Sequence, residues 1–299
     1  MGETRLVELE NRGLLAVTGQ DARTLLQGII SNDAERPTAD CAIYATLLTP
    51  QGKFLHDFFV YEIGGVVMIE CEGPRLADLA KRLTFYRLRA AVEFTDRSAE
   101  FAVLALVGPN AAAAAGFDQS AAAGSARPLG GGIAAIDPRL AALGARLLVP
   151  AADAAAVSAD LDAGPGTPED YDRHRLALGV PDGSRDMAVE KSFLLENNIE
   201  DLNGVDFRKG CYVGQELTAR TKYRGNIRKR LYRVHVEGPL PEPGSDITVG
   251  GKVVGEMRSG RDGVGLALLR REDVEKAGDG VLEAGQAKLR AEKPEWAEF

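Results

Sequence analysis

Two hairpin signals in the first third of the chain constrain the fold more than any other feature. Thr49-Pro50-Gln51-Gly52 and Gly64-Gly65 each join apolar, strand-like runs, because Pro and Gly in such clusters favour tight turns. The runs that they separate are 41–48, 54–61 and 66–71. Apolar residues at helical spacing precede the hairpins at 22–30 and follow them after Pro74. Antiparallel hairpins between single helices predict an α+β fold, not a doubly wound parallel sheet.

The pattern changes near residue 228. Helix-like and strand-like runs alternate up to that point, so we expect an α+β body over 1–228. Beyond it, Tyr232, Val234 and Val236 alternate with polar residues. Further short β-like runs follow, separated by Gly and Pro, at 247–249, 252–257, 265–269 and 287–291. Short strands at this rhythm predict a small all-β barrel or sandwich over 229–299.

Charge and cysteine usage narrow the class of protein. With 36 Lys and Arg against 44 Asp and Glu, the formal charge is -8, which argues against a general nucleic-acid coat and leaves a local basic patch open. No apolar run reaches the ~20 residues that cross a bilayer, and the first residues lack the layout of a signal peptide. Three widely spaced cysteines exclude a disulfide framework. We therefore expect a soluble, cytoplasmic protein with no membrane partner.

The segment 207–216 contains the strongest candidate for chemistry. Cys211 lies between Gly210 and Gly214, and Arg208 and Lys209 precede it. A helix is predicted to begin at 215, with an acid in its first turn. Neighbouring cations and a helix N-terminus both lower the pKa of a thiol, which favours the nucleophilic or metal-binding thiolate. The alternative is a buried, inert cysteine, which is our expectation for the cysteines of the two strand runs, Cys41 and Cys71.

A basic stretch and one acid are weaker candidates. Residues 220–233 carry Arg or Lys at seven positions and no acid, which suggests a site for phosphates, a polycarboxylate tail or RNA, although a solvated linker and strand face explains the stretch equally well. Asp57, on a strand among apolar residues, is a candidate general base or simply part of an outward strand face. The three histidines are scattered, so we predict no metal site.

The eight residues Lys209-Gly210-Cys211-Tyr212-Val213-Gly214-Gln215-Glu216 resemble the signature of the YgfZ-type folate-binding proteins, relatives of the glycine-cleavage T-protein (aminomethyltransferase). Further blocks of the chain resemble the family in the same order: 18–22, 26–28, 32–33, 50–53, 179–181, 219–220 and 223–225. The resemblance implies two intertwined ferredoxin-like units and a C-terminal β-barrel around a central channel that holds tetrahydrofolate. It also implies a role in maturing or repairing iron–sulfur enzymes, including some that modify tRNA.

Residue roles follow from the resemblance and the local pattern together. We predict catalytic roles for Cys211, Lys209 and Asp57, with Lys209 and Arg220 keeping the thiol ionised. The predicted cofactor-binding residues are Tyr171, Asn32, Gly210, Tyr212, Gly214, Gln215, Glu216, Arg220, Arg224 and Arg228. Arg224 and Arg228 would pair with the glutamate tail of folate, because guanidinium groups suit carboxylates.

The chain departs from the family pattern at three positions. An Asp-Asp pair of the T-proteins appears here as His56-Asp57, and a Glu that grips the pterin is replaced by Ala177. Of two aromatic positions of the YgfZ type, one is Gly13 and the other Tyr171. These departures argue against standard aminomethyl transfer.

Three functions stay open at this point. The first is a tetrahydrofolate-binding accessory protein of iron–sulfur cluster assembly or repair that uses Cys211, with folate and iron–sulfur client or assembly proteins as partners. The second is an enzyme, a tetrahydrofolate-dependent aminomethyl- or methyltransferase with Asp57 as base. The third is a module without chemistry that binds RNA or a protein through the basic stretch.

Overall fold

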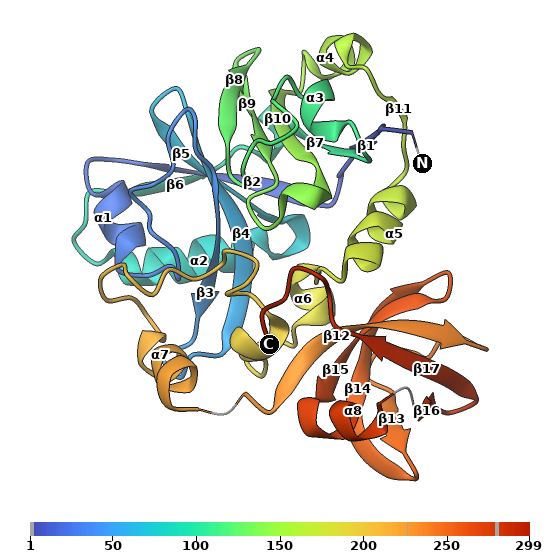
Figure 1. The fold of residues 1–299 in the computed structure, drawn as a ribbon. Coiled ribbons are helices and arrows are strands. Elements are labelled where there is room, and N and C mark those ends of the chain that lie inside the picture. Colours follow the sequence, from blue (N-terminus) through green and yellow to red (C-terminus); the bar gives the residue numbers. More distant parts are fainter. Residues whose placement is uncertain (1–2, 226, 279–280) are drawn as a thin grey trace. The chain divides into compact units, whose positions relative to one another are not determined.

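The computed structural model describes residues 3–225, 227–278 and 281–299 (Figure 1). Their contacts divide the chain into two compact units, each built from separated segments. The first, called here the two-sheet unit, comprises residues up to 48, 56–171 and 202–213. The second, the barrel unit, comprises 49–55, 172–201 and the residues from 214 onward. None of the helices in the described ranges has both the length and the apolar character needed to span a bilayer.

The first sheet of the two-sheet unit has the strand order β11-β1-β7-β10-β9-β8. Its strands are β1 (Arg5–Glu8), β7 (Phe101–Val107), β8 (Ala126–Leu129), β9 (Gly132–Ile136), β10 (Ala145–Pro150) and β11 (Gly164–Pro165). Only the pairing of β1 with β11 is parallel among those described. Leu104, Leu106, Ile136 and Leu147 form its apolar core, with α3 (Ala111–Ala114) and α4 (Ala154–Asp160) adding alanines and Val157.

The second sheet has the order β3-β4-β5-β2-β6. Its strands are β2 (Arg12–Thr18), β3 (Ile43–Leu48), β4 (Phe54–Ile63), β5 (Val66–Glu72) and β6 (Glu93–Asp96). The helical segments of this part are α1 (Ala22–Gln27), η1 (Gly73–Arg75), α2 (Leu76–Arg87), η2 (Ser98–Glu100) and, farther along, η3 (Ala141–Leu143). Because the chain leaves the first sheet after β1, builds the second and returns at β7, the two sheets are intertwined in sequence.

The barrel unit contains a closed barrel in the order β12-β15-β14-β13-β16-β17. Its strands are β12 (Lys229–Glu237), β13 (Asp246–Val249), β14 (Lys252–Arg261), β15 (Val264–Arg270), β16 (Leu282–Ala284) and β17 (Ala287–Glu292). Closure pairs both edges of the sheet, and the interior is filled by Val234, Ile247, Met257, Leu269 and Leu289. Helical segments of this unit are α6 (Gly183–Asp186), η4 (Leu195–Asn197), α7 (Gln215–Arg224) and α8 (Arg271–Ala277); α5 (Pro168–Leu178) begins in the other unit.

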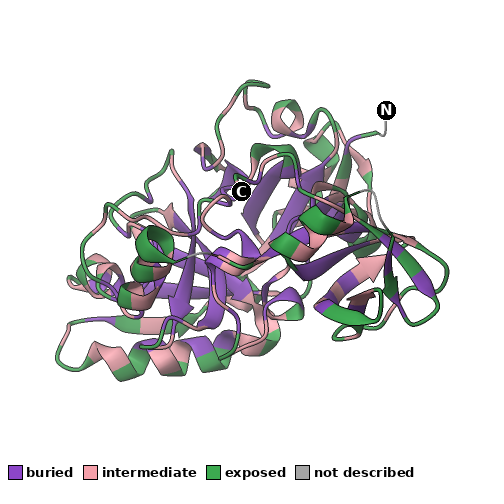
Figure 2. Cartoon of the chain, turned by 60° about the horizontal axis from the view of Figure 1, so that its bottom comes forward, coloured by how far each residue is buried: buried purple, intermediate pink, exposed green. Residues whose placement is uncertain are grey.

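The predicted fold class is confirmed: the chain is α+β and has a closed C-terminal barrel, not a sandwich. Figure 2 shows buried residues concentrated in the strands and exposed residues on the outer sides of the helices. Strands β1, β8, β11 and β16 were not predicted. The division at residue 228 stays a prediction, because the barrel begins at Lys229 whereas the compact units also exchange segments earlier in the chain.

A buried carboxylate joins the two sheets of the two-sheet unit. Glu70 of β5 is fully buried and accepts hydrogen bonds from Arg12 of β2 (2.7 Å) and from Arg146 of β10 (Nε at 3.2 Å). The Tyr61 hydroxyl donates to its second oxygen at 2.9 Å. Burial alone raises the pKa of the Glu70 carboxyl, but the charges of Arg146 and Arg12 outweigh this effect and hold the pKa at about 2. We call these four residues the Glu70 cluster.

We expect Glu70→Gln to lower the free energy of unfolding by about 3–5 kcal/mol at neutral pH, because it removes the buried negative charge that the guanidinium groups of Arg12 and Arg146 share. The control is Glu72→Gln, since Glu72 is half-buried and lies 3.7 Å from Arg75; we expect a loss of about 1 kcal/mol or less. Urea denaturation measures both. Equal losses in the two variants would contradict the assigned role of Glu70.

The difference in unfolding free energy between the wild type and Glu70→Gln should depend on pH, which provides a second test of the role of Glu70. The pKa of Glu70 in the folded protein, about 2, lies below its usual value of 4.5. The stabilisation from this carboxylate is therefore complete above pH 4.5 and is lost as the pH falls through about 2. The stability difference between the wild type and Glu70→Gln should shrink across that window, and a difference that stays constant would contradict the ionic assignment.

Candidate functional site

Cys211 lies on an anchored loop of the two-sheet unit. The loop, 202–213, contains the exposed Cys211 and is held at its start by Ser31, whose hydroxyl donates to the Gly204 carbonyl at 2.6 Å. The Asp206 amide donates to the Ser31 carbonyl at 3.0 Å. We call this segment the Cys211 loop. Cys211 is exposed, so the alternative of a buried cysteine does not hold at this position.

Lys209 provides the second anchor of the Cys211 loop. Its ammonium donates to the carbonyl oxygens of Ile30 and Asn32, each at 2.7 Å, and lies 5.2 Å from the centroid of the Tyr212 ring. Burial lowers the pKa of Lys209 to about 8, although Asp33 and Asp206 act in the opposite direction. These contacts give Lys209 a part in holding the loop. Its predicted influence on the ionisation of Cys211 stays a prediction.

Asn32 connects the same loop to the second sheet. Its buried side-chain amide donates to the carbonyls of Tyr44 and Asn203, both at 2.8 Å, and its oxygen accepts from the Asp33 amide at 2.8 Å. Both amide hydrogens therefore serve the fold. The arrangement makes Asn32 a positioning residue, and its predicted contact with a cofactor stays a prediction.

His56 and Asp57 point to opposite faces of the second sheet, as neighbours on a strand must. The Asp57 carboxylate is buried and accepts from the Tyr44 hydroxyl at 2.9 Å. Burial raises the pKa of that hydroxyl, and the charge of Asp57 raises it further. On the other face, His56 lies 2.8 Å from Asp78, and burial lowers its pKa to about 4. The structure thus makes Asp57 a partner of Tyr44, and its predicted role as a base stays a prediction.

Tyr171 is fixed by two arginines. Its hydroxyl accepts from Arg139 at 2.8 Å and from Arg146 at 3.1 Å, and its side chain is half-buried. Arg139 makes a paired interaction with the buried Asp137 at 3.0 and 2.8 Å. Both guanidinium groups lie over the Phe59 ring, 4.9 and 4.1 Å from its centroid. Through Arg146, the Glu70 cluster therefore contacts Tyr171. Of the two aromatic positions in the family pattern, this is the one at which the chain keeps an aromatic residue.

These contacts join four predicted residues into one network within the two-sheet unit: Asn32, Asp57, Tyr171 and Lys209. Asn203 of the Cys211 loop completes it by donating to the carbonyls of Pro138 and Arg139 at 3.2 and 3.3 Å. The sequence reading missed Arg12, Tyr44, Glu70, Arg139 and Arg146. A charged residue inside an otherwise apolar run would have indicated two of them, because Glu70 and Arg146 each lie in such a strand.

The last three residues of the eight-residue signature, 214–216, lie in the barrel unit. Gly214 precedes α7 in the left-handed region (φ 83°), which glycine adopts readily. Gly52 of the first hairpin also has a positive φ, and a Cβ there would lie 3.1 Å from the Gly214 carbonyl and 3.3 Å from Leu217. The close approach explains glycine at position 52. Gln215 is half-buried and Glu216 exposed, and their predicted contacts with a cofactor stay predictions, as do those of Gly210 and the buried Tyr212.

The basic stretch divides into two groups. Arg230 donates to the Leu195 carbonyl at 2.7 Å, Lys222 lies 2.5 Å from Glu200, and Arg233 contacts Glu292 and the Ala177 carbonyl. These cations serve the fold of the barrel unit. The other members are the exposed Arg220, Arg224 and Arg228 and the half-buried Lys229.

Two of the departures noted in the sequence have structural consequences. Gly13 lies in β2, where a Cβ would meet the Leu76 side chain at 2.7 Å, so helix α2 occupies the space that a larger residue would need. Ala177 is exposed on α5 and offers no carboxylate. Of the other cysteines, Cys71 is buried as predicted, and burial raises its pKa to about 12, whereas Cys41 is only half-buried.

Comparisons with known proteins place these features in a family context. The family model described as "CAF17, C-terminal beta-barrel domain" matches residues 228–299, and that of the "GCVT N-terminal domain" matches residues 3–117. The mitochondrial iron–sulfur cluster assembly factor IBA57 of Homo sapiens is 37% identical over 96% of this chain and 84% of its own length. The Mus musculus factor of the same name is 36% identical over 89% of this chain and 77% of its own length.

Among solved structures, the glycine cleavage system aminomethyltransferase T from Bartonella henselae superposes with a TM-score of 0.79. The match covers 98% of this chain and 85% of that protein at 16% sequence identity, so it shows a shared fold. The T-protein-like fold implied by the resemblance is confirmed. The YgfZ type in particular stays a prediction. The cytoplasmic location expected from composition and cysteines is wrong by these comparisons, because the IBA57 relatives are named as mitochondrial.

The exposures of the three thiols predict their order of reaction. We expect iodoacetamide to modify Cys211 first in the native protein, Cys41 more slowly, and Cys71 only after unfolding, because Cys71 is buried and its pKa lies far above neutrality. Mass spectrometry of peptides from timed reactions gives the order. Modification of Cys71 before Cys211 would contradict the placement of the loop.

Proposed function

The chain belongs to the family of IBA57 iron–sulfur cluster assembly factors, and we propose that it supports the assembly or repair of iron–sulfur clusters through the thiol of Cys211. The single observation that carries this proposal is the exposure of Cys211 on a loop whose backbone is held by Ser31 and Lys209. An exposed side chain on a fixed loop can be presented to a partner protein in one orientation. The clients of this activity include, in our proposal, iron–sulfur enzymes that modify tRNA.

Thiol chemistry suits this function. Thiolates are the ligands that hold iron–sulfur clusters in proteins, and four of them typically bind one cluster. Cys211 supplies one such ligand, so the remaining ligands would come from a client or an assembly partner. Cys71 cannot take this role in the folded protein, because its sulfur is buried. In our proposal Cys211 accordingly binds iron of a cluster as a thiolate ligand during assembly or repair.

We also propose tetrahydrofolate as a ligand of the two-sheet unit. A pterin stacks on an aromatic ring, and Tyr171 offers a half-buried ring whose hydroxyl is held by Arg139 and Arg146. This position fits the ligand. Gly13 does not, because Leu76 occupies the space beside it, and Ala177 lacks a carboxylate. The proposal therefore assigns recognition of the pterin chiefly to Tyr171. Bound tetrahydrofolate would supply a carrier for one-carbon groups.

The thiol proposal predicts a functional loss without a loss of stability. In cells that lack the gene, Cys211→Ser should restore iron–sulfur enzyme activity no better than an empty vector, whereas Cys41→Ser should restore it fully. Because Cys211 is exposed, its substitution should change the free energy of unfolding by about 0.5 kcal/mol or less. Enzyme activity is measured in extracts with equal amounts of each variant. Full restoration by Cys211→Ser would remove the thiol from the mechanism.

The folate proposal predicts a pattern among three variants in calorimetric titrations with tetrahydrofolate. Tyr171→Phe keeps the ring and should bind nearly as the wild type does, whereas Tyr171→Leu should weaken binding about tenfold, since stacking on one aromatic side chain contributes about 1–3 kcal/mol. Tyr223→Leu, which removes an exposed ring of the barrel unit, is the control and should have no effect. Absence of binding by the wild type would refute the assignment of the ligand and leave the thiol proposal standing.

A further inference from the structure

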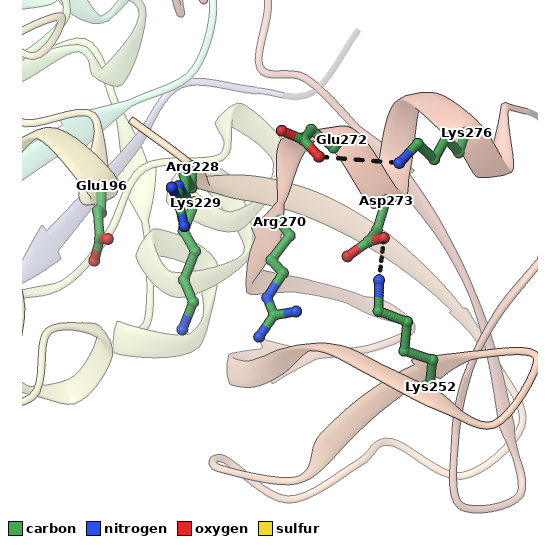
Figure 3. Close-up of a pocket in the computed structure, with 8 residues that line it drawn as sticks. All are labelled: Glu196, Arg228, Lys229, Lys252, Arg270, Glu272, Asp273 and Lys276. Carbon is green, nitrogen blue, oxygen red and sulfur yellow. Dashed lines mark hydrogen bonds and ion pairs between the residues drawn. The ribbon is translucent and has the colours of Figure 1, made fainter. Parts of the chain in front are cut away.

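The barrel unit contains a pocket of about 670 Å³ that takes no part in the function proposed above (Figure 3). Its walls come from η4, the junction before β12, the start of β14, the end of β15 and helix α8. The residues that line it are Glu196, Arg228, Lys229, Lys252, Arg270, Glu272, Asp273 and Lys276. All eight are ionisable, five of them as cations. We call this cavity the barrel pocket.

The cations of the barrel pocket fall into two groups. On one side, Lys252 lies 2.7 Å from Asp273, and Lys276 lies 3.9 Å from Glu272, so each of the two α8 acids that line the pocket neutralises a lysine. On the other side are Arg228, Lys229 and Arg270, for whose side chains no ion pair is found among the described residues. Figure 3 shows the side chains of Lys229 and Arg270 extending in the same direction, with the two ion pairs marked beside them. The net excess of positive charge therefore lies at one end of the pocket.

Strand pairing holds two of these cations together. Lys229 of β12 and Arg270 of β15 are directly opposite partners in the antiparallel ladder. Side chains opposite each other lie on the same face of the sheet, and like charges in such pairs are destabilising. Arg228 is fixed beside them, because its carbonyl accepts a hydrogen bond from the Arg271 amide at 2.9 Å. An anion bound between the three side chains would replace this repulsion with attraction.

The remaining acid opposes the cations only weakly. Glu196 lines the pocket from η4, and burial raises the pKa of its carboxyl, while Lys229 is the foremost of the cations that lower it. Its negative charge is thus disfavoured relative to that of an exposed glutamate. In its neutral form Glu196 carries a hydroxyl hydrogen that can be donated to an anionic oxygen.

We propose that the barrel pocket binds a small polyanion, a molecule with two or more phosphate or carboxylate groups, between Arg228, Lys229 and Arg270. Guanidinium groups form paired hydrogen bonds with both kinds of group, and an ammonium adds a compact charge. The volume lies within the range of small-molecule sites, about 300–1,000 Å³. The lining contains no aromatic residue on which a base could stack, which favours a small anion over a nucleic acid.

Titration of the full chain tests the proposal. We would titrate it at low salt with inorganic tripolyphosphate and, separately, with citrate, because these anions represent the phosphate and carboxylate sources of the same chemistry. Saturable binding of either anion with one site per chain is expected. Arg270→Gln should weaken that binding about tenfold, the effect of losing about 1.4 kcal/mol of interaction. Preference for one anion identifies the source.

The control is Arg290→Gln, which removes an exposed arginine of the same barrel outside the barrel pocket. It should leave the affinity for tripolyphosphate or citrate unchanged. Circular dichroism and thermal unfolding of both variants would establish that the barrel is intact. Failure of both anions to saturate the wild type at millimolar concentrations would overturn the proposal, as would equal weakening by the two substitutions. Binding of an RNA oligonucleotide but of neither small anion would overturn it as well. None of these results bears on Cys211, so the two proposals can fail separately.

Discussion

The ion pairs of Glu70 with Arg12 and Arg146 are the interaction on which the two-sheet unit depends. Burying one carboxylate and two guanidinium groups is unfavourable unless each is matched in charge and hydrogen-bonded. Here the buried Asp137 carboxylate lies 3.7 Å from Arg146, and the Tyr61 hydroxyl donates to Glu70. Since Arg146 belongs to the first sheet and Glu70 to the second, this match fixes one sheet against the other. Burial raises the cost of any partial arrangement, so the cluster favours a single alignment of the sheets.

The candidate site follows from that alignment. Arg146 also donates to the Tyr171 hydroxyl, and Arg139 donates to the same oxygen, so the cluster sets the position of this ring. The backbone of Arg139 in turn accepts from Asn203, where the Cys211 loop begins. Lys209 holds the other end of the loop by donating to the carbonyls of Ile30 and Asn32. The exposed thiol is therefore the end point of a connected set of buried contacts, which explains how a solvent-facing loop keeps a defined course.

Much of the architecture could be predicted from local pattern. The predicted runs 54–61 and 66–71 lie in β4 and β5, and α7 begins at Gln215 as predicted. The buried ion pairs could not be predicted, because Arg12 and Arg146 are 58 and 76 residues from Glu70 and a single sequence does not record which residues meet. The sequence suggested one anion site for the whole basic stretch, 220–233. In the structure, however, Arg230 and Arg233 donate to backbone carbonyls within the barrel unit. The predicted cytoplasmic location was wrong because net charge and the number of cysteines do not determine the cellular compartment of a protein.

The central claim is that the function of Cys211 depends on the anchoring of its loop and not on the presence of a thiol alone. The most direct measurement is the activity of iron–sulfur enzymes in cells whose only copy of the protein carries Lys209→Gln, with Cys211 unchanged. The substitution removes the ammonium that holds the carbonyls of Ile30 and Asn32. Our account predicts a severalfold loss of activity at an unchanged amount of folded protein. Full activity in that strain would contradict it.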